Sequence, residues 1–298
     1  SKFVLICPYS RMVEPQIKQG ACQLSTPRPN YGLFTAFFVF GEIIACFAFG
    51  KAMRLLLIDN SNTRTKFAVT APGQDGYDVQ HVATRELEPP LIEKLQALEF
   101  DASVISSVVP EKAALLREGL AARPLHEISH QSALSIGIDY PHPEQIGADR
   151  LANAVAVHAR IGAPAIVVDF GTAVTFDVVG GSGTQASYLG GVIAPGLASM
   201  TDYLHQSTAL LPEIDLAEPE SAIGKSTTEA MRSGAVYGYR GMIREVLQAI
   251  QRELDAVPTV LATGGDATLI ADGLPEISEV IADLTLEGIR LIGERNLT

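Results

Sequence analysis

Two short stretches of the sequence share one order of residue types that could bind phosphate. The stretch LLLIDNSNTRTKF (55–67) has an apolar run that ends in Asp59, then a turn of small polar residues, then a second run. The stretch AIVVDFGTAVTFD (165–177) repeats this order with Asp169 and Thr172. Such a turn presents backbone N–H groups and hydroxyls to phosphate oxygens, while its Asp can hold a cation directly or through water. Two facing copies could therefore grip a polyphosphate from both sides.

Either stretch alone is weak evidence, because Asp, Asn, Ser and Gly also form ordinary hairpin turns. Both stretches together, with a third turn in ATGGD (262–266), favour a divided phosphate site. None of the three turns has the Walker spacing of Gly and Lys, so we do not expect a P-loop enzyme.

A further stretch, YPHPEQIGADRLANAVAVHARIGAP (140–164), contains GADR at the start of a predicted helix. Leu151, Val155 and His158 follow at helical spacing. The helix dipole favours an acidic residue in the first turn, so Asp149 has two interpretations. It is either a residue that stabilises the helix start or a carboxylate of a functional site.

The elements around these stretches have the order of an α/β protein. Apolar runs of strand length alternate with segments of helical periodicity from Met53 onward. Each half has three strands, a helix, a strand and a helix, which indicates a duplicated domain with the site in the cleft between the copies. We predict strands at 53–59, 65–71, 77–84, 102–109, 165–171, 173–180, 186–196 and 258–266, and helices at 89–98, 227–254 and 285–296.

Charge and composition favour a small-molecule partner over nucleic acid. The 298 residues are 47% hydrophobic, enough for a buried core, and carry a net charge of −12, which would repel a phosphate backbone. Residues 53–298 contain no cysteine, which fits a reducing cytoplasm. We expect no membrane association for this part of the chain.

Residues 1–52 differ from the rest of the chain. They hold all three cysteines and seven of the eleven Phe, and their five Lys or Arg stand against two Glu. The apolar segment 33–50 is long enough to suggest a membrane span, but Glu42 near its middle would cost roughly 2.5 kcal/mol or more in a bilayer. We expect Met53 to be the natural start, with residues 1–52 as upstream sequence or an extension outside the fold.

The chemistry-bearing pieces resemble those of type III pantothenate kinases in kind and in order. They are DNSNT, Y…GADR, DFGTAVTFD, GGVIAPG, LPEIDL, IGKSTTEAMRSG and TGG, spread over residues 53–298. The three turns also resemble the superfamily of acetate and sugar kinases, heat-shock chaperones and actin, in which two ribonuclease-H-like domains clamp ATP. The resemblance implies an α/β fold with this actin-like duplication, domains at 53–162 and 163–298, and an interdomain cleft.

The resemblance also implies an activity and its site residues. Members phosphorylate the hydroxyl of pantothenate with ATP, the first step of coenzyme A biosynthesis, and work as homodimers with the substrate near the subunit interface. Asp149 corresponds to the proton acceptor and Asp169 to the ligand of a monovalent cation, K⁺ or NH₄⁺, while Asp59 is placed to hold Mg²⁺. The substrate-binding positions are Tyr140, Gly147, Ala148, Asp149, Arg150 and Thr227. The ATP-binding positions are Asp59, Asn60, Ser61, Asn62, Thr63, Arg64, Thr65, Lys66 and Thr172, with Gly264 and Gly265 on the adenosine side.

One position departs from the family pattern. The first turn usually reads Asp-x-Gly-Asn-Thr, and Ser61 stands at the Gly position. Because Gly permits a positive φ and close approach of phosphate, Ser61 predicts weaker ATP binding. Two alternatives therefore stay open: a non-catalytic regulator related to Bvg accessory factors, and another small-molecule kinase of the superfamily. Intact Asp59, Asp149, Arg150 and Asp169 weigh against the regulator, and GADR with the upstream Tyr140 weighs against a sugar kinase.

Overall fold

The computed structural model of the protein describes residues 37–39, 42–44, 53–70, 76–181 and 185–297. The chain divides into two compact units, Ser1–Ala52 and Met53–Thr298. In the first unit, Phe37–Val39 (β1) and Glu42–Ile44 (β2) pair as antiparallel strands. The rest of the apolar segment 33–50 lies outside the described residues. In the described part of the chain, no helix combines the length and apolar character needed to cross a membrane.

The first sheet of the second unit consists of Leu55–Asn60 (β3), Arg64–Val69 (β4), Gln80–Ala83 (β5), Ala102–Ser107 (β6) and Leu125–Glu127 (β7). The strands lie in the order β5-β4-β3-β6-β7. β3 and β4 form an antiparallel hairpin, and β6 pairs parallel with β3. All six residues of β3 are buried, as expected for a central strand with an apolar run.

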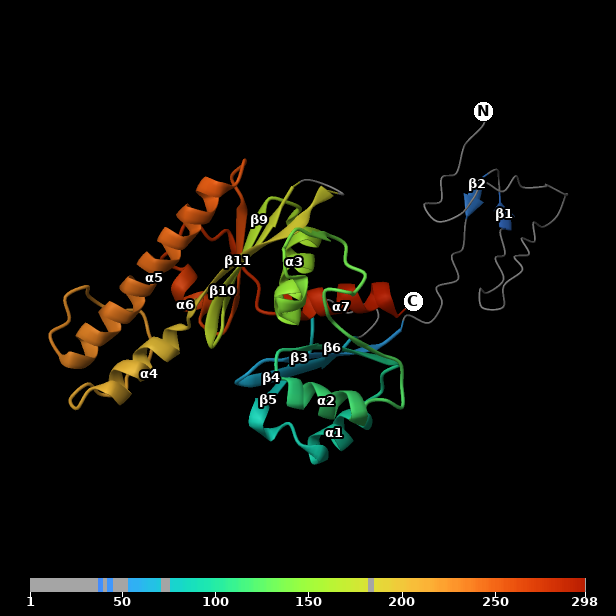
Figure 1. Ribbon diagram of the computed structural model, residues 1–298, viewed down its shortest axis with the longest axis horizontal. Helices are drawn as coiled ribbons and strands as arrows, with labels where there is room; N and C mark the ends of the chain where they lie inside the picture. The colour runs from blue at the N-terminus through green and yellow to red at the C-terminus, as the bar shows by residue number, and fades with distance from the viewer. Residues whose placement is uncertain (1–36, 40–41, 45–52, 71–75, 182–184, 298) are drawn as a thin grey trace. The chain divides into compact units, whose positions relative to one another are not determined.

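Two helices, Pro89–Gln96 (α1) and Pro110–Gly119 (α2), cover one face of this sheet (Figure 1). Each begins with proline in its first turn, where the missing N–H would have no partner within the helix in any case. Ile92 of α1 and Leu116 of α2 join Ile58 of β3 in one buried apolar cluster. The sequence predicts α1, whereas α2 is not among the predicted helices.

The second sheet consists of Gly137–Ile138 (β8), Ala165–Phe170 (β9), Ala173–Gly180 (β10), Ser187–Pro195 (β11), Thr259–Gly264 (β12) and Glu279–Val280 (β13). The strands lie in the order β13-β12-β9-β10-β11-β8. The hairpin of β9 and β10, with β12 parallel to β9, repeats the arrangement of β3, β4 and β6. The predicted α/β class with two sheets is therefore confirmed.

Three helices cover the outer face of the second sheet: Leu197–Ser207 (α4), Thr227–Glu253 (α5) and Ala267–Ala271 (α6) (Figure 1). They pack on β9 and β10 through a cluster that includes Tyr239 of α5 and Phe170 of β9. The sequence predicts the long helix α5, but α4 and α6 are not among the predicted helices.

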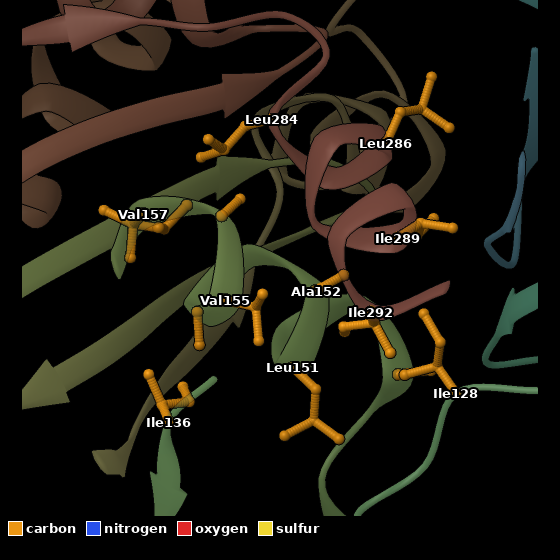
Figure 2. Packing of buried hydrophobic residues seen from close by; sticks show 14 of the residues in the cluster. Ile128, Ile136, Leu151, Ala152, Val155, Val157, Leu284, Leu286, Ile289 and Ile292 are labelled. Atoms are coloured by element: carbon orange, nitrogen blue, oxygen red, sulfur yellow. The ribbon is translucent and has the colours of Figure 1, made fainter. Parts of the chain in front are cut away.

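Two further helices, Ala148–Ile161 (α3) and Leu284–Asn296 (α7), lie between the sheets. Figure 2 shows their apolar side chains, including Leu151 and Ile289, in one cluster. Both sheets contribute to this cluster, for example through Leu57 of β3 and Val167 of β9. The unit is therefore layered, with α1 and α2, the first sheet, α3 and α7, the second sheet, and the outer helices in succession (Figure 1). Apolar side chains of both sheets pack in the same cluster as α3, the helix that carries the GADR segment.

The C-terminal helix α7 packs against β3 and β6 of the first sheet as well as against α3. Gly288 allows the close approach of α7 to α3, because a Cβ there would collide with the backbone of Ala152. The last helix of the chain thus helps to cover the first sheet. The boundary between domains 53–162 and 163–298 stays a prediction.

Candidate active site

The two predicted phosphate turns meet where β3 and β9 end. The Oγ1 atoms of Thr63 and Thr172 lie 2.8 Å apart and share a hydrogen bond, which joins the first turn to the second. Asp59 and Asp169 are each the last residue but one of their strands. Asp59 and Asp169 therefore lie near the same junction between the two turns, although they come from different halves of the chain.

A set of polar contacts beneath the first turn fixes its backbone. The Thr84 hydroxyl donates to the carbonyl of Ser61 at 2.6 Å, and the Thr84 N–H donates to the carbonyl of Thr63 at 2.9 Å. The Asn60 amide donates to the Thr65 hydroxyl at 2.8 Å, and both side chains are buried. Because Asn60 and Thr65 are used inside the fold, their predicted contacts with ATP stay predictions.

Asp59 has a buried carboxylate whose Oδ1 has no hydrogen-bond partner among the described residues. Burial raises the pKa of Asp59 to about 7, Lys66 opposes this shift, and the charges of Asp149 and Asp169 add to it. The three carboxylates are thus close enough to influence one another. A buried, unpaired carboxylate is costly, so a cation beside Asp59 would be stabilising.

The start of α3 brings the GADR segment to the same place. Asp149 lies in the first turn, and its Oδ1 accepts a hydrogen bond from the backbone N–H of Arg150 at 2.8 Å. Burial raises the pKa of the Asp149 carboxyl, and Arg150 opposes the shift. Gly147 precedes the helix, and a Cβ there would collide with Oδ1 of Asp149. Ala148 begins the helix as a buried residue.

Arg150 and Tyr140 border one buried aromatic ring, that of Tyr188. The Arg150 Cζ lies 5.8 Å from the centre of this ring, and Tyr140 meets it edge-on with ring centres 6.3 Å apart. Gly190 has φ +122°, and a Cβ there would lie 3.4 Å from the Tyr140 ring. The Arg150 guanidinium and the Tyr140 phenol therefore share one aromatic neighbour, Tyr188.

The second turn is held from two sides. Asp169 is a half-buried residue, and its Oδ2 accepts a hydrogen bond from the Asn153 amide of α3 at 3.2 Å. Burial raises the pKa of Asp169, and the Asn153 hydrogen bond opposes the shift. The carbonyl of Thr172 accepts from the N–H of Gly196 at 3.1 Å and from the Ser199 hydroxyl at 3.0 Å.

The third turn follows β12, the strand beside β9. Gly264 has φ +97°, and a Cβ there would collide with the backbone of Phe170. A Cβ at Gly265 would meet no atom within 4 Å, so the turn leaves open space on that side. Burial raises the pKa of Asp266, and the charge of Arg64 from the first hairpin opposes the shift. The third turn therefore lies near the first.

Comparison with known proteins agrees with this geometry. A family model described as type III pantothenate kinase matches residues 55–249. A type III pantothenate kinase from Akkermansia muciniphila is 55% identical over 246 residues, which cover 82% of this chain and 100% of that protein. The chain belongs to the type III pantothenate kinase family. A second member, from Methylacidiphilum infernorum, is 42% identical over 243 residues, covering 80% of this chain and 88% of that protein.

Two solved structures share the fold of this family member at low identity. A protein from Campylobacter jejuni described as a Baf family transcriptional activator has a TM-score of 0.53 and 18% identity, covering 81% of this chain and 98% of that one. A protein from Listeria monocytogenes described as an N-acetylmannosamine kinase has a TM-score of 0.50 and 9% identity, covering 83% of this chain and 100% of that one. At these identities the likeness shows the fold alone.

One family position, Thr227, is not joined to the site. It is the first residue of α5 and is exposed, next to the capping residue Ser226, whose hydroxyl accepts from the N–H of Glu229 at 3.2 Å. Across the described residues, no hydrogen bond links Thr227 to α3 or to either phosphate turn. Its role in substrate binding stays a prediction. By contrast, Lys66 lies near enough to lower the pKa values of both Asp59 and Asp169.

Three polar residues that hold this candidate site together were missed from the sequence: Asn153, Asp177 and Thr84. Asn153 follows Asp149 by four positions on α3, a spacing that places both on one helix face. Asp177 is the last residue of the DFGTAVTFD stretch. Those two signals were available, whereas nothing in the sequence around Thr84 points to the first turn.

The fit of the site to cations differs between the two turns. The buried, unpartnered Oδ1 of Asp59 suits Mg²⁺, a cation that takes one or two carboxylates and completes its shell with phosphate and water. Asp169 offers one carboxylate, oriented by Asn153. In the described ranges, no group of three or more His, Cys, Asp or Glu could hold a metal ion. A cation at Asp169 would therefore take most of its ligands from carbonyls, nucleotide or water.

Proposed function

We propose that this chain transfers a phosphoryl group from ATP to the hydroxyl of pantothenate, which gives 4′-phosphopantothenate in the first step of coenzyme A biosynthesis. The observation that carries the proposal is the 2.8 Å contact between Thr63 and Thr172, which brings two phosphate turns together. The carboxylate of Asp149 lies close enough to raise the pKa of Asp59. Two phosphate clamps beside a third carboxylate are what transfer to a hydroxyl requires.

Asp149 is the proton acceptor in this proposal. Phosphoryl transfer through a loose transition state needs alignment and charge neutralisation more than a strong base, so an ionised Asp can take the hydroxyl proton late. Its Oδ1 is held by the N–H of Arg150, which leaves Oδ2 for the substrate hydroxyl. Burial raises the pKa of Asp149 and so makes its carboxylate a better acceptor.

The substrate side is formed by Arg150 and Tyr140. The planar fork of the Arg150 guanidinium suits the carboxylate of pantothenate, and the Tyr140 ring beside it provides an apolar edge. Gly147 and Ala148 complete the surface at the start of α3, where a larger residue than Gly147 would press on Asp149.

The nucleotide side is formed by the three turns. Residues 59–66 and Thr172 hold the phosphates from opposite sides, and the turn at Gly264 and Gly265 lies beside the adenosine. The support for this arrangement is the joining of the first two turns by Thr63 and Thr172 and the nearness of Arg64 to Asp266.

We place Mg²⁺ at Asp59 and a monovalent cation, K⁺ or NH₄⁺, at Asp169. When bound, the cations neutralise charge on the phosphate oxygens. The chain supplies the unpartnered Oδ1 of Asp59 for the first site and the Asp169 carboxylate, steadied by Asn153, for the second.

We also propose a cytoplasmic homodimer. Large apolar side chains are exposed on and around α4, and exposed apolar surface of this kind marks interaction sites. These residues are Ile193, Met200, Tyr203, Leu204, Leu210, Ile223 and Tyr237. Thr227 lies between Ile223 and Tyr237 along the chain, and a substrate site near the subunit interface would account for its exposure.

The test is an assay of the purified protein with ATP, Mg²⁺, K⁺ and pantothenate, run beside Asp149→Asn. We expect 4′-phosphopantothenate, measured by mass spectrometry, and a loss of about 10²- to 10⁴-fold in kcat for the variant, the usual contribution of a general base. Asp255→Asn is the matched control, because Asp255 is exposed beyond the end of α5. This variant should keep the parent rate.

Two outcomes would replace the proposal with one of its rivals. Phosphate transfer to a hexose with none to pantothenate would identify another small-molecule kinase of the superfamily. A folded parent that turns over neither acceptor would point to the non-catalytic regulator.

A further inference from the structure

One buried carboxylate has no role in the site as described so far. Asp177 lies within β10 with none of its side chain exposed. Its Oδ1 accepts from Arg150 Nε at 2.6 Å and from the Tyr188 hydroxyl at 3.4 Å. Its Oδ2 accepts from Asn153 Nδ2 and from the Thr175 hydroxyl, both at 3.4 Å. Both oxygens are thus occupied by protein donors, so Asp177 is not free to bind phosphate or a cation.

The short contact between Asp177 and Arg150 is a buried ion pair. The Arg150 side chain is 14% exposed and that of Asp177 is fully buried. Taking two charges out of water costs about as much as their attraction returns, so such a pair is a poor source of stability. A better explanation of the pair is that Asp177 fixes the orientation of the Arg150 guanidinium.

The pair uses only one side of the Arg150 fork. Nε is taken by Asp177, and the nearest other acceptor recorded for the guanidinium in the described residues is the Phe176 carbonyl, 3.5 Å from Nη2. Gly191 leaves space for this group, because a Cβ there would lie 2.8 Å from Nη2. Nη1 and the second hydrogen of Nη2 therefore remain for a planar carboxylate.

Asn153 connects this pair to the phosphate side. Its amide nitrogen carries two hydrogens and donates to Asp169 Oδ2 at 3.2 Å as well as to Asp177 Oδ2. Its Oδ1 accepts from the Thr285 hydroxyl of α7 at 2.8 Å, which agrees with an amide that turns its nitrogen towards the two carboxylates. One continuous network thus runs from Arg150 to the second phosphate turn.

We propose that Asp177 is a positioning residue that holds the Arg150 guanidinium so that its terminal nitrogens bind the substrate carboxylate, with Asn153 fixing Asp177 relative to Asp169. The proposal rests on the proposed function, since pantothenate supplies the carboxylate. Asp177 does not touch the substrate, and its effect passes through Arg150. Its loss should therefore weaken recognition of the carboxylate and leave ATP binding nearly unchanged.

The test compares two ligands that differ only at the carboxylate. The dissociation constants of pantothenate and of pantothenol, in which an alcohol replaces the carboxylate, are measured by calorimetry on the parent and on Asp177→Asn. We expect pantothenate to bind about tenfold or more weakly to the variant, since this contact is a charge-assisted one. Pantothenol binding and the KM for ATP should each change by less than about twofold.

Two further variants show whether the effect is specific. Glu287→Gln is the matched control, because it breaks the Arg160–Glu287 pair, also 2.6 Å long, near the other end of α3. It should leave both dissociation constants unchanged. In an Arg150→Met background, Asp177→Asn has no guanidinium to position and should change pantothenate binding by less than about twofold.

The outcomes separate this proposal from the kinase activity. An unchanged pantothenate affinity in folded Asp177→Asn, an equal loss for both ligands, or a full loss in the Arg150→Met background would overturn the positioning role. If Asp177→Asn does not fold, Tyr188→Phe decides, because it removes only one hydroxyl from Oδ1. A loss of about twofold to threefold for pantothenate alone is then expected, and no selective loss overturns the proposal. A parent that binds pantothenate but transfers no phosphate contradicts the kinase activity instead.

Discussion

The two hairpin turns share a sequence pattern but treat their aspartates differently. In the first turn, Asp59 is buried and its Oδ1 has no partner among the described residues. In the second, Asp169 is partly exposed and accepts a hydrogen bond from Asn153 of α3. Oδ1 of the first carboxylate is thus left without a partner among the described residues, whereas the second carboxylate is hydrogen-bonded to the helix that carries the GADR segment.

This difference indicates how a duplicated hairpin can take two roles. An unsatisfied buried carboxylate gains most from a cation, so the first turn suits binding of a metal–phosphate group. The Asp169 carboxylate is already oriented by its hydrogen bond from Asn153. The same Asn153 amide also donates to Asp177, which in turn accepts a hydrogen bond from Arg150. The second turn is therefore suited to coupling the phosphate side to the substrate side.

The largest expected effect comes from Asp59→Asn. We expect kcat/KM for ATP to fall by about 10²- to 10³-fold, because the proposed site loses the charge that would hold Mg²⁺ beside the phosphates. The same variant should melt at a higher temperature than the parent in the absence of nucleotide, because it removes a carboxylate whose pKa burial raises to about 7. Asp169→Asn should gain less stability, since Asn153 already donates a hydrogen bond to Oδ2 of that carboxylate. Equal gains in the two variants would contradict the comparison.

The raised pKa of Asp59 should also make the stability of the protein depend on pH. Its pKa is about 7 in the folded protein against 3.8 for an ordinary Asp carboxyl, so between these values the folded state binds more protons than the unfolded state. The free energy of unfolding should therefore decrease as pH rises from about 4 to 7, by about 1.4 kcal/mol for each unit of pKa difference at most. Asp59→Asn should flatten this slope in denaturant titrations at pH 5 and pH 8, and a parallel slope would contradict the assignment.

A smaller effect is expected beneath the first turn. Thr84→Val removes the hydroxyl that donates to the Ser61 carbonyl at 2.6 Å, which should cost about 1–2 kcal/mol of stability. The KM for ATP should rise by roughly threefold to tenfold, as a loosened turn binds phosphate less well. Ser199→Ala, which removes a donor to the Thr172 carbonyl at the exposed second turn, is the counterpart and should change stability by less than about 0.5 kcal/mol. A larger loss of stability in Ser199→Ala than in Thr84→Val would show that the second turn depends more on its supporting hydrogen bond than the first.

The smallest effect is expected for Ser61→Gly. The sequence suggests that Ser61 weakens ATP binding, but the backbone there is fixed at both polar atoms, with its N–H donating to the Arg64 carbonyl at 3.1 Å and its carbonyl accepting from Thr84. We therefore expect the KM for ATP to change by less than about threefold. A tenfold improvement would show that Ser61 hinders the first turn.

Local sequence patterns were enough to predict most of the elements that carry the site. The apolar runs before Asp59 and Asp169 form β3 and β9, and GADR begins α3, because periodicity and turn residues act over a few neighbouring positions. The equivalence of the two hairpins followed from the same local patterns. α2, α4 and α6 were missed even though α2 begins with a proline in its first turn, a recognised start signal.

The tertiary structure alone decided how these elements work together. The contact between Thr63 and Thr172, the support by Thr84 and the pairing of Asp177 with Arg150 all join segments that are distant in the sequence. No local pattern specifies such partners, since they depend on how the two sheets pack around α3 and α7. The raised pKa of Asp59 has the same origin, because desolvation is a property of the packed interior and not of the residue.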